Sequence, residues 1–248
     1  MPALTLPGGT VEAELLVLDK DGVLVDFHHL WNAVTRTRAA ALAAEAGRPG
    51  LAGALAELLG LADDGTVAPG GLLAVGTRTE ATIAAATALH QVGLPWAGAR
   101  EAAFRAFAAA DALDFEALCR PLPGAVAAVR ALTAAGFKLA IATTDRTAGA
   151  TRFLAVSGLA ECFVAVVGAD RVARSKPEPD MFLLACAEAG VSPGRAIMIG
   201  DGVVDLQMGR EAGAQATIGV LSGVGGAAAL AEWAHAIVPD LGAIAASI

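Results

Sequence analysis

The segment Glu14–Asp26, ELLVLDKDGVLVD, decides how the chain is organised. A run of branched aliphatic residues ends in Asp19, Lys20, Asp21 and Gly22, and a second apolar run follows. The first run predicts a short buried strand, and Asp-Gly is a turn signal. Side chains two apart in extended backbone point the same way, so Asp19 and Asp21 can share a site while Lys20 points elsewhere. Two carboxylates this close repel, which calls for a raised pKa or a bridging cation.

Apolar runs and helical patches alternate along the second half of the chain. A helix that starts at proline and closes at Gly136 is followed by the strand candidates KLAIATT, CFVAVVG, RAIMIGD and ATIGVL. Helical segments of about ten to fifteen residues separate them, which is typical of βαβ units and a parallel sheet. We therefore predict an α/β fold with a Rossmann-like, doubly wound parallel sheet, to which the strand before Asp19 also belongs.

Residues 28–116 differ in character from the rest of the chain. They form alanine-rich helical patches broken by glycine and proline, with no strong strand candidate. Thr77 and Glu80 have the spacing of a capping box before a helical run. We predict a Rossmann-like core of residues 1–27 and 117–248 with a helical insert between them.

Composition limits the classes of function. The 248 residues carry a formal net charge of −8 and no basic block, which argues against a nucleic-acid surface. Three widely spaced cysteines without a CxxC motif indicate buried thiols in a reducing compartment. The first residues lack the features of a signal peptide, and no membrane span is predicted. We expect a cytoplasmic protein with no nucleic-acid or membrane partner.

Polar residues follow several of the predicted strands, where open α/β sheets bind their ligands. Thr143 and Thr144 end KLAIATT, and Lys176 lies in SKPEPDMF ahead of a helix. Asp201 ends RAIMIGD, and Asp205 follows one helical turn later. Oxygen ligands without histidine or cysteine suit Mg²⁺. Lys176 would add a fixed positive charge and Thr143 a hydroxyl donor, and together these groups could neutralise a phosphoryl group.

Each motif taken alone also has an ordinary structural explanation. DKDG alone is often only a turn, and KP is commonplace. An EF-hand loop is excluded, because Gly22 falls too early and Leu30 stands where that loop needs glutamate. The evidence for a functional site is the combination of all four motifs, in this order along the chain and each at the end of an apolar run.

This set of motifs resembles the haloacid dehalogenase superfamily, which is dominated by phosphatases. The matches are LDKDGVLVD, IATTD, SKPEPDMF and IMIGDGVVDLQMGREAG, for the first to the fourth motif of the family. The first and fourth are specific, and the middle two are weak alone but correctly placed. The resemblance spans roughly residues 13–27 and 117–248. The insert lies where the family has its helical cap of the C1 type, although its own sequence matches nothing identifiable.

The resemblance implies a role for each matching residue. Asp19 would be the nucleophile that forms an aspartyl phosphate, and Asp21 would act first as general acid and then as base. Thr143 and Lys176 would hold the phosphoryl oxygens. Thr144 occupies the place where relatives often carry asparagine, and it is assigned to the substrate-binding set.

The resemblance also implies a Mg²⁺ site. Its ligands would be Asp19, the main-chain carbonyl of Asp21, and Asp201, with Asp205 supporting them from behind. Gly22 of the first motif is assigned to substrate binding. The leading hypothesis is a Mg²⁺-dependent phosphatase for a small phosphorylated metabolite, similar to phosphoglycolate phosphatases.

Two alternatives stay open, a phosphosugar mutase of the same superfamily and a non-catalytic module that binds phosphometabolites. A dehalogenase is disfavoured because that branch lacks the aspartate that Asp21 provides. A phosphonate-cleaving activity would need a lysine in the cap, and residues 28–116 contain none. Arg78 is a candidate for a substrate carboxylate, against the alternative of a solvated helix end. His29 and Trp31 could serve either in packing or in contact with the substrate. The sequence does not determine whether the protein is a monomer or a homodimer.

Overall fold

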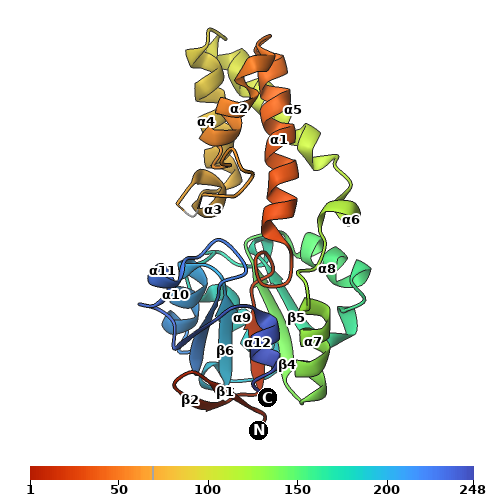
Figure 1. The fold of residues 1–248 in the computed structure, drawn as a ribbon, viewed down its shortest axis with the longest axis vertical. Coiled ribbons are helices and arrows are strands. Elements are labelled where there is room, and N and C mark those ends of the chain that lie inside the picture. Colours follow the sequence, from red (N-terminus) through yellow and green to blue (C-terminus); the bar gives the residue numbers. More distant parts are fainter. Residues whose placement is uncertain (69) are drawn as a thin grey trace. The chain divides into compact units, whose positions relative to one another are not determined.

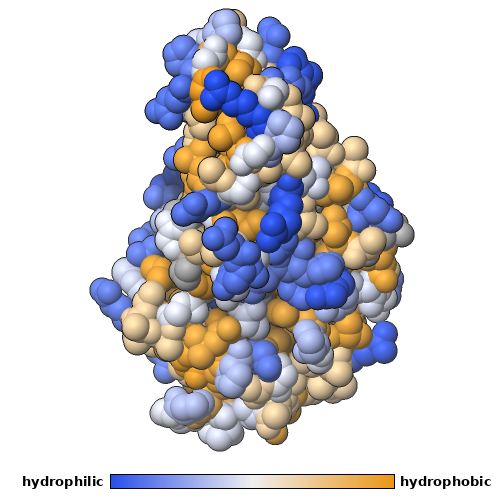
Figure 2. All heavy atoms as spheres, turned by 45° about the horizontal axis from the view of Figure 1, so that its top comes forward, coloured by the Kyte–Doolittle hydropathy of each residue, from blue (hydrophilic) through white to orange (hydrophobic). Residues whose placement is uncertain are grey.

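The computed structural model describes residues 1–68 and 70–248 and divides the chain into two compact units. One unit combines residues 1–26 with 120–248, and the other contains residues 27–119 (Figure 1). Among the described residues, no helix is long and apolar enough to cross a membrane. Hydrophilic and hydrophobic residues are intermixed on the face drawn in Figure 2.

The first unit is built on a six-stranded parallel sheet with the order β5-β4-β3-β6-β7-β8. From β3 the chain adds strands toward one edge of the sheet, and from β6 it adds strands toward the other edge. The sheet is therefore doubly wound, as the sequence predicts. Right-handed crossovers place the helices of the two halves on opposite faces. The strands are β3 (Leu15–Leu18), β4 (Lys138–Thr143), β5 (Phe163–Gly168), β6 (Ala196–Gly200), β7 (Ala216–Val220) and β8 (Ala236–Val238).

Helices connect the strands of this sheet, and an antiparallel hairpin that the sequence did not reveal precedes it. The hairpin consists of β1 (Ala3–Leu6) and β2 (Gly9–Glu12). The helices are α7 (Ala125–Ala134), α8 (Thr147–Val156), α9 (Asp180–Ala189), α10 (Val203–Glu211), α11 (Ala227–Leu230) and α12 (Leu241–Ala245). Short 3₁₀ turns cover Ala160–Cys162, Ala169–Arg171 and Pro193–Arg195.

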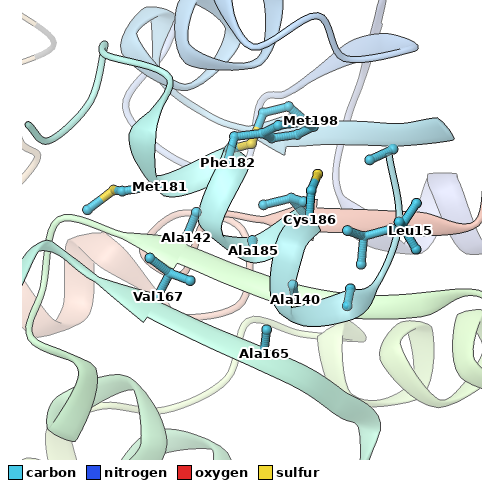
Figure 3. Close-up of a cluster of buried hydrophobic side chains, with 14 of the residues drawn as sticks. Leu15, Ala140, Ala142, Ala165, Val167, Met181, Phe182, Ala185, Cys186 and Met198 are labelled. Carbon is cyan, nitrogen blue, oxygen red and sulfur yellow. The ribbon is translucent and has the colours of Figure 1, made fainter. Parts of the chain in front are cut away.

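Helix α9 covers the middle of the sheet with one apolar face. Figure 3 shows its residues Met181, Phe182, Ala185 and Cys186 beside side chains of the neighbouring strands. Every residue of β3 and β6 is buried, so these strands have no solvent-facing side. Continuous apolar strands of this kind are typical of a parallel sheet covered on both faces. The packing fixes the carboxyl ends of β3 and β6, from which the polar residues emerge.

The second unit is helical. Its elements are α1 (Phe27–Glu45), a 3₁₀ turn (Pro49–Leu51), α2 (Ala52–Leu58), α3 (Leu72–Val75), α4 (Arg78–Gln91), α5 (Trp96–Asp111) and α6 (Phe115–Leu118). The expected capping box is present, because the Thr77 hydroxyl accepts from the Glu80 N–H and the Glu80 carboxylate accepts from the Thr77 N–H. The junctions expected from the sequence, after residues 27 and 116, lie close to the ends of this unit. Its role as a cap stays a prediction.

The core beneath α9 gives a direct test of the packing. Phe182 is fully buried and its neighbour Leu183 is 41% exposed. We expect Phe182→Ala to lower the free energy of unfolding by about 3–5 kcal/mol, because it removes buried apolar surface and leaves a cavity. Leu183→Ala should cost about 1 kcal/mol or less. Urea denaturation followed by circular dichroism measures both, and equal losses would contradict the described packing.

Candidate active site

Two aspartates meet where the strand order of the sheet reverses. Asp19 directly follows β3 and Asp201 directly follows β6, and these strands are hydrogen-bonded neighbours in which Leu18 pairs with Ile199. The Asp19 N–H donates to the Ile199 carbonyl at 2.9 Å, which continues the ladder beyond the end of β3. This reversal is the usual ligand position in an open α/β sheet.

A buried lysine joins two carboxylates at this point. Lys176 Nζ lies 2.7 Å from Asp19 Oδ1 and 2.6 Å from Asp205 Oδ1, and 2% of its side chain is exposed. Burial alone would lower the pKa of Lys176, but the charges of Asp19 and Asp205 and their hydrogen bonds raise it above its ordinary value. The ammonium group is therefore a fixed positive charge.

Asp205 and Asp201 are each held by a backbone donor. The Gly202 N–H donates to Asp205 Oδ2 at 2.9 Å, which satisfies an N–H group at the start of α10. The Val224 N–H donates to Asp201 Oδ2 at 2.8 Å. Carboxylate oxygens of Asp19, Asp201 and Asp205 all lie within 4.8 Å of one another. The structure thus gathers three of the predicted aspartates with Lys176.

The loop after β7 forms part of this site, and the sequence analysis missed it. A Cβ atom on Gly223 would overlap the Asp201 carboxylate, and one on Gly225 would overlap the Asp201 carbonyl oxygen. A Cβ atom on Gly22, which has φ of +82°, would overlap the same carboxylate, and Ser222 Oγ donates to the Gly22 carbonyl at 2.7 Å. The glycine-rich run SGVGG after a predicted strand was the available signal.

Burial makes the ionised carboxylates costly. It is the main reason that the pKa of Asp19 rises to about 6, with Asp205 adding to the rise and Lys176 opposing it. Burial also raises the pKa of Asp201, and the charges of Asp205 and Asp19 raise it further. Lys176 supplies only one positive charge against three carboxylates. A bound cation would relieve this repulsion.

The donor set fits Mg²⁺. It consists of oxygen atoms without histidine or cysteine, as Mg²⁺ prefers. Asp205 uses one oxygen for Lys176 and the other for the Gly202 N–H, which suits a supporting residue better than a ligand. Asp201 uses Oδ2 for Val224, and its second oxygen has no protein partner in the part of the chain that the structure describes.

Asp21 is not among the three gathered carboxylates, and its carboxylate pairs with the neighbouring Lys20. Lys20 Nζ lies 2.9 Å from Asp21 Oδ1 and 3.4 Å from Asp145 Oδ2, and its side chain is 1% exposed. The expectation that Lys20 points away from the carboxylates is therefore wrong for Asp21. The alternation of side chains holds only within the strand, and β3 ends at Leu18 before the turn at Gly22.

The two threonines differ in exposure. Thr143 ends β4, is fully buried, and its Oγ1 accepts from the Asp145 N–H at 3.1 Å. Thr144 is exposed. Because β4 pairs with β3 in parallel, Thr143 lies at the same edge of the sheet as Asp19. Their parts in substrate binding stay predictions.

The remaining candidates belong to the helical unit. Arg78 already forms a bidentate ion pair with Asp111, in which Nη1 donates to Oδ1 at 2.8 Å and Nη2 donates to Oδ2 at 2.6 Å. His29 is half-buried, and Trp31 packs against Phe27 with 6.0 Å between the ring centroids. The guanidinium of Arg78 therefore has a protein carboxylate as its partner, and its role toward a substrate stays a prediction.

Comparison with known proteins identifies the family. Residues 13–213 match the model of the haloacid dehalogenase-like hydrolases, and the chain belongs to that family. It is 41% identical over 102 residues to the probable phosphatase IndB of Dickeya dadantii, covering 41% of this chain and 44% of that protein. It is 34% identical over 126 residues to a phosphoglycolate phosphatase of Cupriavidus necator, covering 50% and 54%. These matches span about half the length of the relatives.

Solved structures share the fold. A haloacid dehalogenase-family hydrolase from Deinococcus radiodurans, crystallised with phosphate and sodium, aligns over 93% of both chains. The TM-score is 0.62 at 24% identity. A likeness at this identity supports the α/β fold and says nothing more about this chain.

The raised pKa values predict that metal-free protein is stabilised by acid. Asp19 has a pKa near 4 when unfolded and about 6 when folded, so the folded state binds more protons within this window. The free energy of unfolding should therefore fall as the pH rises from about 4 to 6, by roughly 3 kcal/mol. Thermal unfolding in EDTA across this range measures the effect.

A variant at Asp201 separates this effect from other titrations. Asp201→Asn removes one buried charge and keeps an oxygen that can accept from Val224. We expect it to melt at a higher temperature than the wild type at pH 7.5 in EDTA, and the gain should shrink toward pH 4.5. The exposed Asp63→Asn is the control. A gain that is the same at both pH values would contradict the electrostatic explanation.

Proposed function

We propose that this chain is a Mg²⁺-dependent phosphatase that hydrolyses a small phosphomonoester through an aspartyl-phosphate intermediate. The observation that carries the proposal is the buried Lys176, ion-paired with Asp19 inside a group of three carboxylates at the carboxyl edge of the sheet. Family membership and the relatives named phosphatases support it.

Asp19 is the proposed nucleophile. One of its oxygens would attack phosphorus, and the bond from phosphorus to the leaving oxygen would break. Lys176, at 2.7 Å from Asp19, carries the positive charge that a phosphoryl group needs at this position. Uncatalysed hydrolysis of phosphomonoesters is so slow that enzymes supply up to ~10²¹-fold acceleration. Pre-positioned positive charge in a buried site is the main proposed source of this acceleration.

Mg²⁺ would be held by Asp19, Asp201 and the main-chain carbonyl of Asp21. When bound, it neutralises charge that develops on the phosphoryl oxygens. Asp205 keeps Lys176 and the start of α10 in place, with one carboxylate oxygen toward each. The backbone of Gly223 leaves room for the Asp201 carboxylate, where any side chain would displace it.

Asp21 is the proposed acid and base. It would donate a proton to the leaving oxygen and then take one from the water that attacks the aspartyl phosphate. Lys20 bonds to Asp21 Oδ1 and reaches Asp145, so it would hold the carboxylate in one orientation. Thr143 would donate its hydroxyl to a phosphoryl oxygen, and Gly22 and Thr144 would contribute to substrate binding.

The substrate class follows from the named relatives. One relative is named a phosphoglycolate phosphatase, and another, from Pseudomonas aeruginosa, an N-acetylmuramic acid 6-phosphate phosphatase. Both names describe small phosphorylated metabolites. We propose that this chain acts on a substrate of that kind, and that residues 27–119 act as a cap that recognises the leaving group.

Phosphate release from a panel of phosphorylated metabolites tests the proposal. Wild type with Mg²⁺ should release phosphate, whereas EDTA or Asp19→Asn should reduce the rate by at least about 10³-fold, because each removes part of the phosphoryl-transfer machinery. The exposed Asp63→Asn should retain the wild-type rate. Transfer of the phosphoryl group between positions of a sugar, without release, would instead indicate a mutase. Binding without turnover would indicate a non-catalytic module.

The role of Asp21 is tested by varying the leaving group. General acid catalysis contributes about 10²–10⁴-fold and matters most for alkoxide leaving groups, which need the proton. Asp21→Asn should therefore slow alkyl phosphates much more than p-nitrophenyl phosphate. Lys20→Met should show the same selectivity to a smaller degree, because it loosens Asp21 without removing it. Lys138→Met, at the start of β4, is the matched control. A loss that is uniform across leaving groups would contradict the role given to Lys20.

A further inference from the structure

Helix α1 carries three enclosed polar atoms without partners on one face. They are Trp31 Nε1, Thr35 Oγ1 and Arg38 Nε, which have no hydrogen-bond partner among the described residues. Their spacing of four and three residues places them on a single stripe of the helix. Native proteins satisfy nearly all buried polar atoms, so three such atoms side by side call for an explanation.

Arg38 is a buried cation that forms no ion pair with a carboxylate of the described residues. It is 7% exposed, and its guanidinium lies 4.3 Å from the Phe107 ring centroid and 5.5 Å from that of Trp31. These rings attract the cation but offer no hydrogen-bond acceptor in the plane of its N–H groups. Within residues 1–68 and 70–248, two other arginines of the helical unit have carboxylate partners, Arg78 with Asp111 and Arg105 with Glu45.

The missing partner must be an acceptor. The indole N–H of Trp31 and the guanidinium N–H of Arg38 can only donate, and the hydroxyl of Thr35 can donate as well. Three donors on one stripe match an oxygen-rich anion. A guanidinium fork in particular matches the two oxygens of a carboxylate or a phosphate.

The local charge favours a carboxylate over a phosphate dianion. Arg78 lies 5.7 Å from the same Phe107 ring, and Asp111 offsets its charge. Two guanidinium charges and one carboxylate charge leave one net positive charge, which a single carboxylate would neutralise. Burial, with the charge of Arg78 adding to it, lowers the pKa of Arg38 to about 10, so the group stays cationic at neutral pH.

We propose that Trp31, Thr35 and Arg38 form a binding site for the carboxylate group of a small-molecule ligand. All three residues belong to the helical unit. This site does not depend on the proposed phosphatase activity.

The fluorescence of Trp31 reports on the site directly. The chain has three tryptophans, so Trp96→Phe with Trp233→Phe leaves Trp31 as the single emitter. Titration of this full-length protein with malonate should give a saturable change in emission, with a Kd on the order of millimolar. Malonamide, which has the same shape without charge, should give none. Inorganic phosphate should bind at least several-fold more weakly than malonate.

Variants then identify the residues. Arg38→Gln should weaken malonate binding at least tenfold, and Thr35→Val, which keeps the shape of the side chain, should weaken it several-fold. Arg100→Gln, an exposed arginine on α5, should leave it unchanged. Circular dichroism confirms that each variant is folded, and Thr35→Val serves if Arg38→Gln is not.

Three results would overturn the proposal. The first is no response of Trp31 up to about 50 mM malonate, well above the expected Kd, which would mean that water alone serves the three donors. The second is equal binding by wild type, Arg38→Gln and Thr35→Val, which would place the anion elsewhere. The third is tighter binding of phosphate than of malonate, which would reject the carboxylate as the ligand group.

Discussion

The buried ion pair of Lys176 with Asp19 and Asp205 is the interaction on which the site depends. It joins segments 157 residues apart in the sequence, and it sets one ammonium group against two carboxylates at 2.6–2.7 Å. Taking one partner away would leave an uncompensated buried charge, which costs about 3–5 kcal/mol. These contacts therefore hold the loop after β3, the loop before α9 and the first turn of α10 in one arrangement.

That arrangement is possible because of the strand order. Strands β3 and β6 are adjacent in space although about 180 residues separate them, and each delivers its aspartate at the same edge. The reversal of strand order leaves that edge uncovered by crossover helices. An acidic chain whose sequence contains no basic block can thus place one buried lysine beside the carboxylates that we propose to hold a cation.

The sequence was sufficient for the sheet and for the residues at its strand ends. The positions of Asp19 and Asp201 could be predicted because apolar runs reveal strands, and strand ends in a parallel sheet converge. Lys176 and Asp205 were predicted from their motifs, ahead of one helix and one helical turn after Asp201. The pairing of Lys20 with Asp21 could not be predicted, because periodicity ends with the strand and a lysine stem can reach in several directions. The hairpin β1–β2 was missed because each strand has only four residues and β2 has no buried residue, so the alternation of the buried Leu4 and Leu6 is too short to stand out.

The two units bury opposite kinds of unpaired polar groups, an excess of acceptors in the first and an excess of donors in the second. In the site of the first unit, burial raises the pKa values of Asp19 and Asp201, and the charge of Asp205 adds to the rise of both. On α1 the imbalance is reversed, since Trp31, Thr35 and Arg38 present donors without acceptors. A folded chain bears both costs only where something outside the chain completes the set. We propose that a divalent cation completes the first set and a ligand carboxylate the second, so that each imbalance indicates the chemistry of its ligand.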